Sequence, residues 1–128
     1  MAKRAKTAGR LEIKRVYQAP ANDDGLRVLV DRLWPRGLTK DKARVDLWLK
    51  EIAPSDALRR RLHGHPEKWD EFVTAYGREL TQEPANSAAA GLRKRFRSQP
   101  VTLLYAARDE THNNAVALKD WLERSGRA

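Results

Sequence analysis

Three apolar runs along the chain have the length of β-strands. Residues 28–30, within a strand predicted over residues 26–31, and residues 101–107 form apolar runs, as strands of a parallel sheet do when both of their faces are buried. Residues 11–17 form a third run, and Lys14 and Arg15 in its middle indicate an edge position. The loop over residues 19–25 is too short for a helical crossover, which leaves the direction of this first strand open.

Five other stretches have the apolar spacing or the capping residues of helices. They cover about residues 39–52, 55–62, 66–80, 87–97 and 113–124. The first begins at Thr39, an acceptable N-cap, and one helical stripe in it consists of Val45, Trp48, Leu49 and Ile52. The third has the strongest signature, because Pro66 suits a first helical position and apolar residues recur every three or four positions as far as Leu80. Gly126 is expected to cap the last helix.

These elements predict an α/β fold. We expect a small layered domain with a mostly parallel sheet of about three or four strands, flanked by about five helices. Residues 11–128 are expected to form this single domain, because no repeat or second domain is visible. Residues 1–10 have no apolar period, and we expect them to be a disordered basic tail.

Composition and charge limit the partners and the cellular location that we expect for this protein. The chain carries 26 Lys and Arg against 17 Asp and Glu, a formal charge of +9. Four basic residues lie in the tail, and without them the balance is 22 against 17, or +5. Such a surface attracts nucleic acid, anionic metabolites and acidic proteins alike. The chain has no cysteine, no run of the ~18 apolar residues that a membrane span needs and no signal-peptide pattern. We therefore expect a cytoplasmic protein with no thiol chemistry and no membrane partner.

The segment after the second strand is the first candidate site. It reads Asp31-Arg32-Leu33-Trp34-Pro35-Arg36-Gly37, and ligand sites in parallel sheets lie beyond the carboxyl ends of strands. Arg32 and Arg36 can hold a phosphate or a carboxylate, and Trp34 can stack on a flat group. Asp31 is a candidate general acid or base. In the structural alternative, the arginines form an ion pair and a helix cap, and Trp34 belongs to the core.

The segment after the last strand, residues 108–114, is the second candidate site. Arg108, Asp109 and Asn113 are candidate ligand-binding residues, and His112 is the residue there that exchanges a proton near neutral pH. Free backbone N–H groups where the next helix begins can receive an anion. In the structural alternative, the polar residues only cap that helix. If the two strands are neighbours, both segments share one rim, and Asp31 and Arg108 lie close together.

Several common chemistries find little support in the sequence. His63 and His65 flank a glycine, a spacing that fits neither a helical nor a zinc-finger site, so no metal is expected. No cofactor is expected either, because closely spaced glycines between a strand and a helix are missing. Basic clusters at residues 59–61 and 93–97 lie on helices without a recognised nucleic-acid motif, which makes nucleic acid the weaker candidate partner.

Three segments of the chain carry a family resemblance. They read RVLVDRLWPRGL (residues 27–38), LWLKEIAPS (47–55) and TLLYAARD (102–109). Together they resemble the YeaO-like branch of the domain-of-unknown-function 488 family, over about residues 11–124. The resemblance implies a compact bacterial α/β protein and no established activity. Longer relatives carry an aspartate–arginine pair that Asp31-Arg32 matches, and near the last strand they carry cysteines and a histidine–arginine pair. This chain departs from them there with Tyr105, Asn113, Asn114 and Ala115, so the resemblance brings no thiol or arginine role to those positions.

The sequence therefore predicts a cleft for a small phosphate- or carboxylate-bearing ligand at the carboxyl ends of two strands. A hydrolase or a transferase is plausible, with Asp31 or His112 as the acid or base and the arginines holding the anion. Two alternatives belong to other classes. One is a nucleic-acid-binding module that uses the basic tail and the helix faces, and the other is a protein-interaction module without catalysis.

Overall fold

The computed structural model describes residues 10–125, which form four strands, five α-helices and three short 3-10 helices. In chain order these are β1 (Leu11–Arg15), η1 (Asn22–Asp24), β2 (Leu26–Leu29), α2 (Lys40–Ala43), β3 (Leu47–Trp48), η2 (Lys50–Ile52), α3 (Asp56–Leu62), η3 (Pro66–Lys68), α4 (Trp69–Leu80), α5 (Ala85–Ser98), β4 (Val101–Tyr105) and α6 (Asn114–Ser125). The predicted disordered tail, apart from Arg10, and the predicted cap at Gly126 lie outside the described residues.

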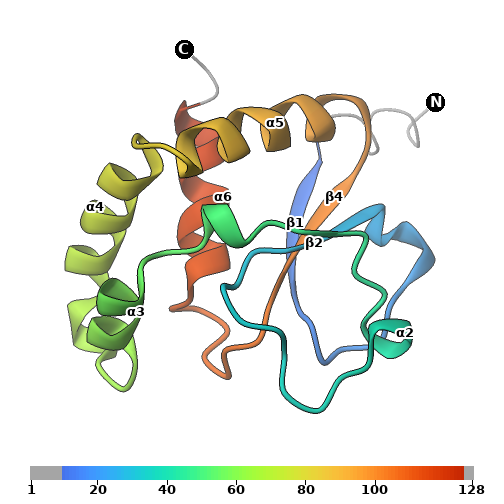
Figure 1. The fold of residues 1–128 in the computed structure, drawn as a ribbon, viewed down its shortest axis with the longest axis horizontal. Coiled ribbons are helices and arrows are strands. Elements are labelled where there is room, and N and C mark those ends of the chain that lie inside the picture. Colours follow the sequence, from blue (N-terminus) through green and yellow to red (C-terminus); the bar gives the residue numbers. More distant parts are fainter. Residues whose placement is uncertain (1–9, 126–128) are drawn as a thin grey trace.

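The strands form one parallel sheet in the order β1-β4-β2-β3 (Figure 1). β4 lies between β1 and β2, pairs in parallel with both, and is buried over its whole length. β1 is an edge strand, as predicted, and its direction is parallel to its neighbour. The two most apolar runs of the sequence are therefore neighbouring strands, and their carboxyl ends meet at one edge of the sheet.

Helices α4, α5 and α6 cover one face of the sheet, and irregular segments together with the short helix α2 cover the other (Figure 1). The larger apolar cluster joins the strands to α4, α5 and α6, and its fully buried members include Val28, Leu103, Tyr76, Leu92 and Leu118. The smaller cluster contains Val16, Leu29, Ala43 and Leu104, with Trp34 and Trp48 packed against it. Because successive strand residues point to opposite faces, Leu29 and Leu104 belong to a different cluster from their neighbours Val28 and Leu103.

The predicted helix over residues 39–52 is wrong beyond its first turn. Thr39 does cap a helix, since its side chain accepts a hydrogen bond from the N–H of Lys42. That helix, α2, ends at Ala43 because Arg44 adopts a left-handed backbone conformation with φ of 49°. The chain then continues as β3, which pairs in parallel with β2. The apolar stripe is thereby divided, with Trp48 on the smaller cluster and Leu49 on the larger one.

Arg27 in β2 explains why this segment becomes a strand. Its N–H donates to the Asp46 carboxylate (2.8 Å), and its guanidinium donates to the carbonyls of Ala43 (2.8 Å) and Arg44 (3.0 Å). The side chain is buried and also forms an ion pair with Asp24. Arg27 and Asp24 lie outside residues 39–52, so helical periodicity within that segment does not reveal these contacts.

The other four predicted helices are present, with ends shifted by a few residues. They are α3, α4 preceded by η3, α5 and α6. Ser55 caps α3 by accepting the N–H of Leu58 (3.2 Å), as its position suggested. Among the described residues, no helix is long and apolar enough to cross a membrane.

Candidate functional site

A cleft of about 1170 Å³ opens at the carboxyl edge of the sheet, beyond the ends of β2 and β4. Its walls come from the segment after β2, the region of α3, the segment between β4 and α6, and the end of β1. All eight residues predicted for the site line it: Asp31, Arg32, Trp34, Arg36, Arg108, Asp109, His112 and Asn113. The topology therefore brings both predicted segments to one rim, as the pairing of the two strands requires.

Asp31 joins the two strand ends at the floor of this cleft. One carboxylate oxygen accepts the N–H of Ala106 just beyond β4 (2.9 Å), and the other accepts the side-chain amide of Asn114 (3.0 Å). The same amide donates to the carbonyl of Val30 (3.0 Å). Burial raises the pKa of Asp31 above its ordinary value, although these two hydrogen bonds and the charge of Arg59 act in the opposite direction.

Arg32 and Trp34 are fixed by contacts within the protein. The Arg32 guanidinium donates to the carbonyls of Ala53 (3.4 Å) and Pro54 (3.2 Å), and no ion pair with Asp31 exists among the described residues. The Trp34 indole N–H donates to the carbonyl of Leu38 (2.7 Å), and its ring meets Trp48 edge to face, 5.4 Å between ring centres. Trp34 thus lies in the cleft wall and packs against the smaller cluster. Its packing agrees with the structural alternative, in which Trp34 belongs to the core.

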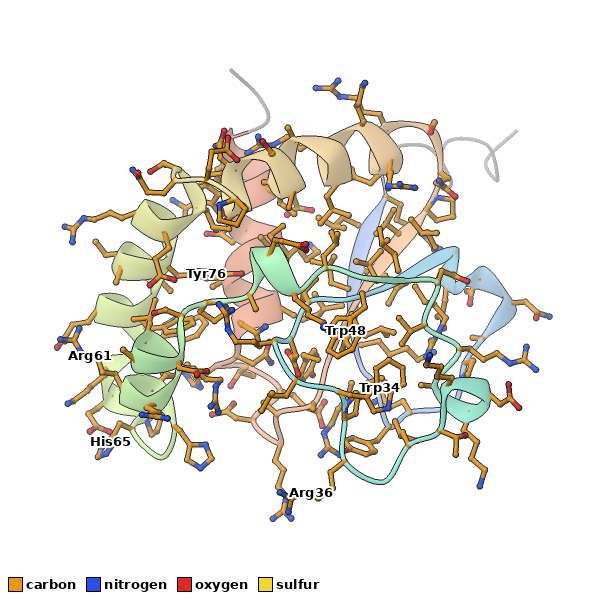
Figure 2. All side chains as sticks on the ribbon, viewed as in Figure 1. Trp34, Arg36, Trp48, Arg61, His65 and Tyr76 are labelled. Carbon is orange, nitrogen blue, oxygen red and sulfur yellow. The ribbon has the colours of Figure 1, made fainter. Side chains whose placement is uncertain are left out.

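Arg32, Arg36 and Arg108 are all exposed, but Arg36 and Arg108 differ from Arg32 because no contact among the described residues holds their guanidinium groups. Arg36 extends away from the fold at the lower edge of Figure 2, and its carbonyl accepts a hydrogen bond from the Tyr17 hydroxyl (2.7 Å). Neither guanidinium forms a hydrogen bond or an ion pair with another residue between 10 and 125. Both side chains are therefore available to an external anion.

The segment between β4 and α6 uses most of its polar groups internally. One Asp109 oxygen accepts the N–H groups of Thr111 (3.0 Å) and His112 (2.9 Å), and these bonds lower the pKa of Asp109. The Asn113 side chain caps α6 by accepting the N–H of Val116 (3.0 Å), and it also donates to the Asp109 carbonyl. The expectation that backbone N–H groups here receive an anion is therefore wrong for Thr111 and His112, whose donors are already satisfied.

His112 stands half-buried at the edge of the cleft. Its Nδ1 lies 2.9 Å from the Thr111 hydroxyl and 3.3 Å from a carboxylate oxygen of Asp109. Its ring meets Trp69 edge to face, 5.2 Å between ring centres. These contacts fix the ring and place Nδ1 against the Asp109 carboxylate.

Five further residues with polar or charged side chains line the cleft and were not among those predicted from the sequence: Arg15, Tyr17, Arg59, His63 and Asn114. Arg15 and Tyr17 come from the end of β1, whose place beside β4 no local pattern revealed. The cleft as a whole is lined by five arginines and two aspartates, a formal balance of +3. No group of three His, Asp or Glu side chains in residues 10–125 is arranged to hold a metal ion.

Comparisons with known proteins agree on one family. Residues 10–127 match a family described as the inactive DUF488-N3 subclade. The uncharacterised protein YeaO of Escherichia coli is 44% identical over 113 residues, which cover 88% of this chain and 96% of that protein. Uncharacterised proteins of Mycobacterium bovis and Mycobacterium tuberculosis are each 42% identical over 113 residues, covering 88% of this chain and 93% of theirs. No solved structure is significantly similar to the chain.

Proposed function

The chain belongs to the inactive DUF488-N3 subclade, and on that premise we propose that its cleft binds a small organic anion, carrying a phosphate or a carboxylate group, without transforming it. The observation that carries this proposal is the pair of free guanidinium groups, Arg36 and Arg108, on the lining of one cleft. Guanidinium groups form strong, charge-assisted hydrogen bonds with phosphates and carboxylates.

The rest of the lining supports an anion in the same place. The Arg15 guanidinium is held by the carbonyls of Ala106 and Ala107, and Arg32 by those of Ala53 and Pro54, so both charges have fixed positions. Fixed charges lose little conformational entropy when a ligand binds. Asp31 and Asp109 oppose an anion, but the five arginines of the cleft lining outnumber these two aspartates.

Thermal melting with inorganic phosphate tests the proposal. A ligand that binds only the folded state stabilises it in proportion to ln(1 + [L]/Kd). We expect phosphate to raise the melting temperature of the native protein above that in sodium chloride of equal ionic strength. The Arg36→Ala/Arg108→Ala variant should lose most of this gain. Its ligand-free stability should stay within about 0.5 kcal/mol of the native value, because both side chains are exposed.

A matched variant separates binding from the general effect of phosphate, which stabilises many proteins by exclusion from their surface. Arg95 is exposed on α5 and does not line the cleft, so Arg95→Ala removes the same kind of charge elsewhere. It should keep the full phosphate effect. An equal rise in the native protein, the cleft variant and Arg95→Ala would contradict the proposal.

A specific observation favours a second candidate function, hydrolysis or group transfer at a phosphate ester. Asp31 combines a raised pKa with a place at the floor of a cleft, as catalytic acids do, and His112 lines the same cleft beside Asp109. Incubation with a panel of phosphate monoesters distinguishes the two functions. We expect no phosphate release above the buffer rate. Release that is lost in both Asp31→Asn and His112→Gln would establish the enzyme instead.

The cytoplasmic location expected from the sequence remains a prediction.

A further inference from the structure

The large exposed apolar side chains of residues 10–125 lie at the cleft. Two large apolar residues are exposed in the part of the chain that the structure describes, Tyr17 (40%) and Leu33 (66%), and both line the cleft. Exposed apolar groups that lie together in a concave site typically contact a ligand. A bare phosphate or a short carboxylic acid would leave this part of the wall uncovered.

Tyr17 is held in a fixed position at this wall. The Arg15 guanidinium lies over its ring, 4.7 Å from the ring centre, and the Tyr17 hydroxyl donates to the carbonyl of Arg36 (2.7 Å). Arg15 is in turn held by two carbonyls beyond β4. The ring and the guanidinium therefore form a flat, ordered surface next to the segment that carries the free charge of Arg36.

From this juxtaposition we propose that the ligand of the cleft is a nucleoside phosphate, with its phosphate at Arg36 and Arg108 and its base against Tyr17 and Leu33. Bases stack on aromatic rings and on arginine planes, a mode that needs no sequence-specific contacts. The cleft volume of about 1170 Å³ exceeds what a lone phosphate requires and leaves room for a sugar and a base. This inference rests on the proposed function and names the class of its ligand.

Calorimetric titration with three probes tests the inference: AMP, ribose 5-phosphate and adenosine. The first carries both recognised groups, the second lacks the base and the third lacks the phosphate. We expect AMP to bind at least about tenfold more tightly than either of the others. Equal affinity for AMP and ribose 5-phosphate would overturn this inference and leave the proposed function standing. Failure of both phosphates to bind would overturn the proposed function as well.

Variants of the apolar wall locate the base. Compared with Tyr17→Phe, which also lacks the hydrogen bond to the Arg36 carbonyl, Tyr17→Ala should bind AMP roughly 5- to 150-fold more weakly, the range expected for loss of one base–aromatic stack, and should bind ribose 5-phosphate equally well. Tyr17→Phe keeps the ring, so AMP affinity should stay within about threefold of native. Leu33→Ala alters a largely exposed side chain and provides a second variant, with a smaller loss for AMP alone. Equal losses for AMP and ribose 5-phosphate in Tyr17→Ala and Leu33→Ala would place the base elsewhere and contradict the inference.

Discussion

Two carboxylates, Asp24 and Asp31, show how the surroundings of a single residue decide its role. Burial alone would raise the pKa of Asp24, but the N–H of Ala21 and the cationic groups of Lys14 and Arg27 lower it overall. Asp31 receives two neutral hydrogen bonds and no ion pair among the described residues, so burial prevails and its pKa is raised. The first is a structural anion, and the second is a weak acid facing a cleft.

Stability should depend on pH through Asp24. Because its pKa is lower in the folded state, its ionised form stabilises the fold above the unfolded pKa of about 3.9, and this contribution is lost as the pH falls through the folded value. Asp24→Asn leaves the buried Arg27 charge unpaired, and we expect it to cost about 3 kcal/mol at pH 7. The cost should shrink toward pH 3. Urea unfolding at both pH values measures it.

Asp23→Asn is the matched control for this change, because Asp23 is the exposed neighbour of Asp24 and its carboxylate has no ion pair with another described residue. It should alter the free energy of unfolding by no more than about 0.5 kcal/mol at either pH. A cost for Asp24→Asn that is the same at pH 7 and pH 3 would show that charge pairing is not its origin.

At the scale of elements, the sequence predicts strands and helices well where local signals agree. β4 is an apolar run, α4 is strongly amphipathic and α3 has a serine N-cap, and each is present near its predicted position. The helix predicted over residues 39–52 was wrong beyond its first turn because Trp48 and Leu49 fit both a helical stripe and the alternating pattern of a strand. Buried hydrogen bonds from Arg27 decide between them, and these are tertiary contacts.

The pairing of β3 with β2 should depend on Asp46. Its carboxylate accepts the N–H of Arg27 (2.8 Å), and three residues later the N–H of Leu49 donates to the carbonyl of Leu29 (2.9 Å). We expect Asp46→Ala to lower the free energy of unfolding by about 1–2 kcal/mol and to speed hydrogen exchange at the Leu49 amide. Asp46→Asn retains an acceptor oxygen and should be milder. Unchanged exchange at Leu49 in Asp46→Ala would exclude this role.

At the scale of the whole molecule, the two basic clusters lie at different ends. α3, with Arg59 on the cleft lining, is close to the carboxyl edge of the sheet, whereas α5 leads into the amino end of β4 on the far side (Figure 1). The exposed Arg61 belongs to α3 and the exposed His65 follows that helix, both at the lower left of Figure 2, and Arg36 lies at the lower edge of the same view. A continuous basic track that joins both helices, as the nucleic-acid alternative would use, is not supported by this arrangement.

The location of the candidate site was predictable from the sequence, but its internal bonding was not. Two apolar runs ending in charged residues were enough to place Asp31 and Arg108 on one cleft, because parallel neighbours end at one edge. That Asp109 satisfies the nearby N–H groups depends on loop geometry, which residue types do not fix. The contribution of Tyr17 depends on the position of β1, whose direction the sequence left open.

The most direct test of the proposal that the cleft binds an anion is a titration of the ¹⁵N-labelled protein with AMP and with inorganic phosphate, followed through its backbone amide signals. We predict saturable shifts for both ligands within residues 31–37 and 106–114, and additional shifts around Tyr17 with AMP alone. The amides of α5 should stay unchanged. Absence of saturable shifts, or shifts confined to α5, would contradict the assignment of this cleft as the site that binds an anion.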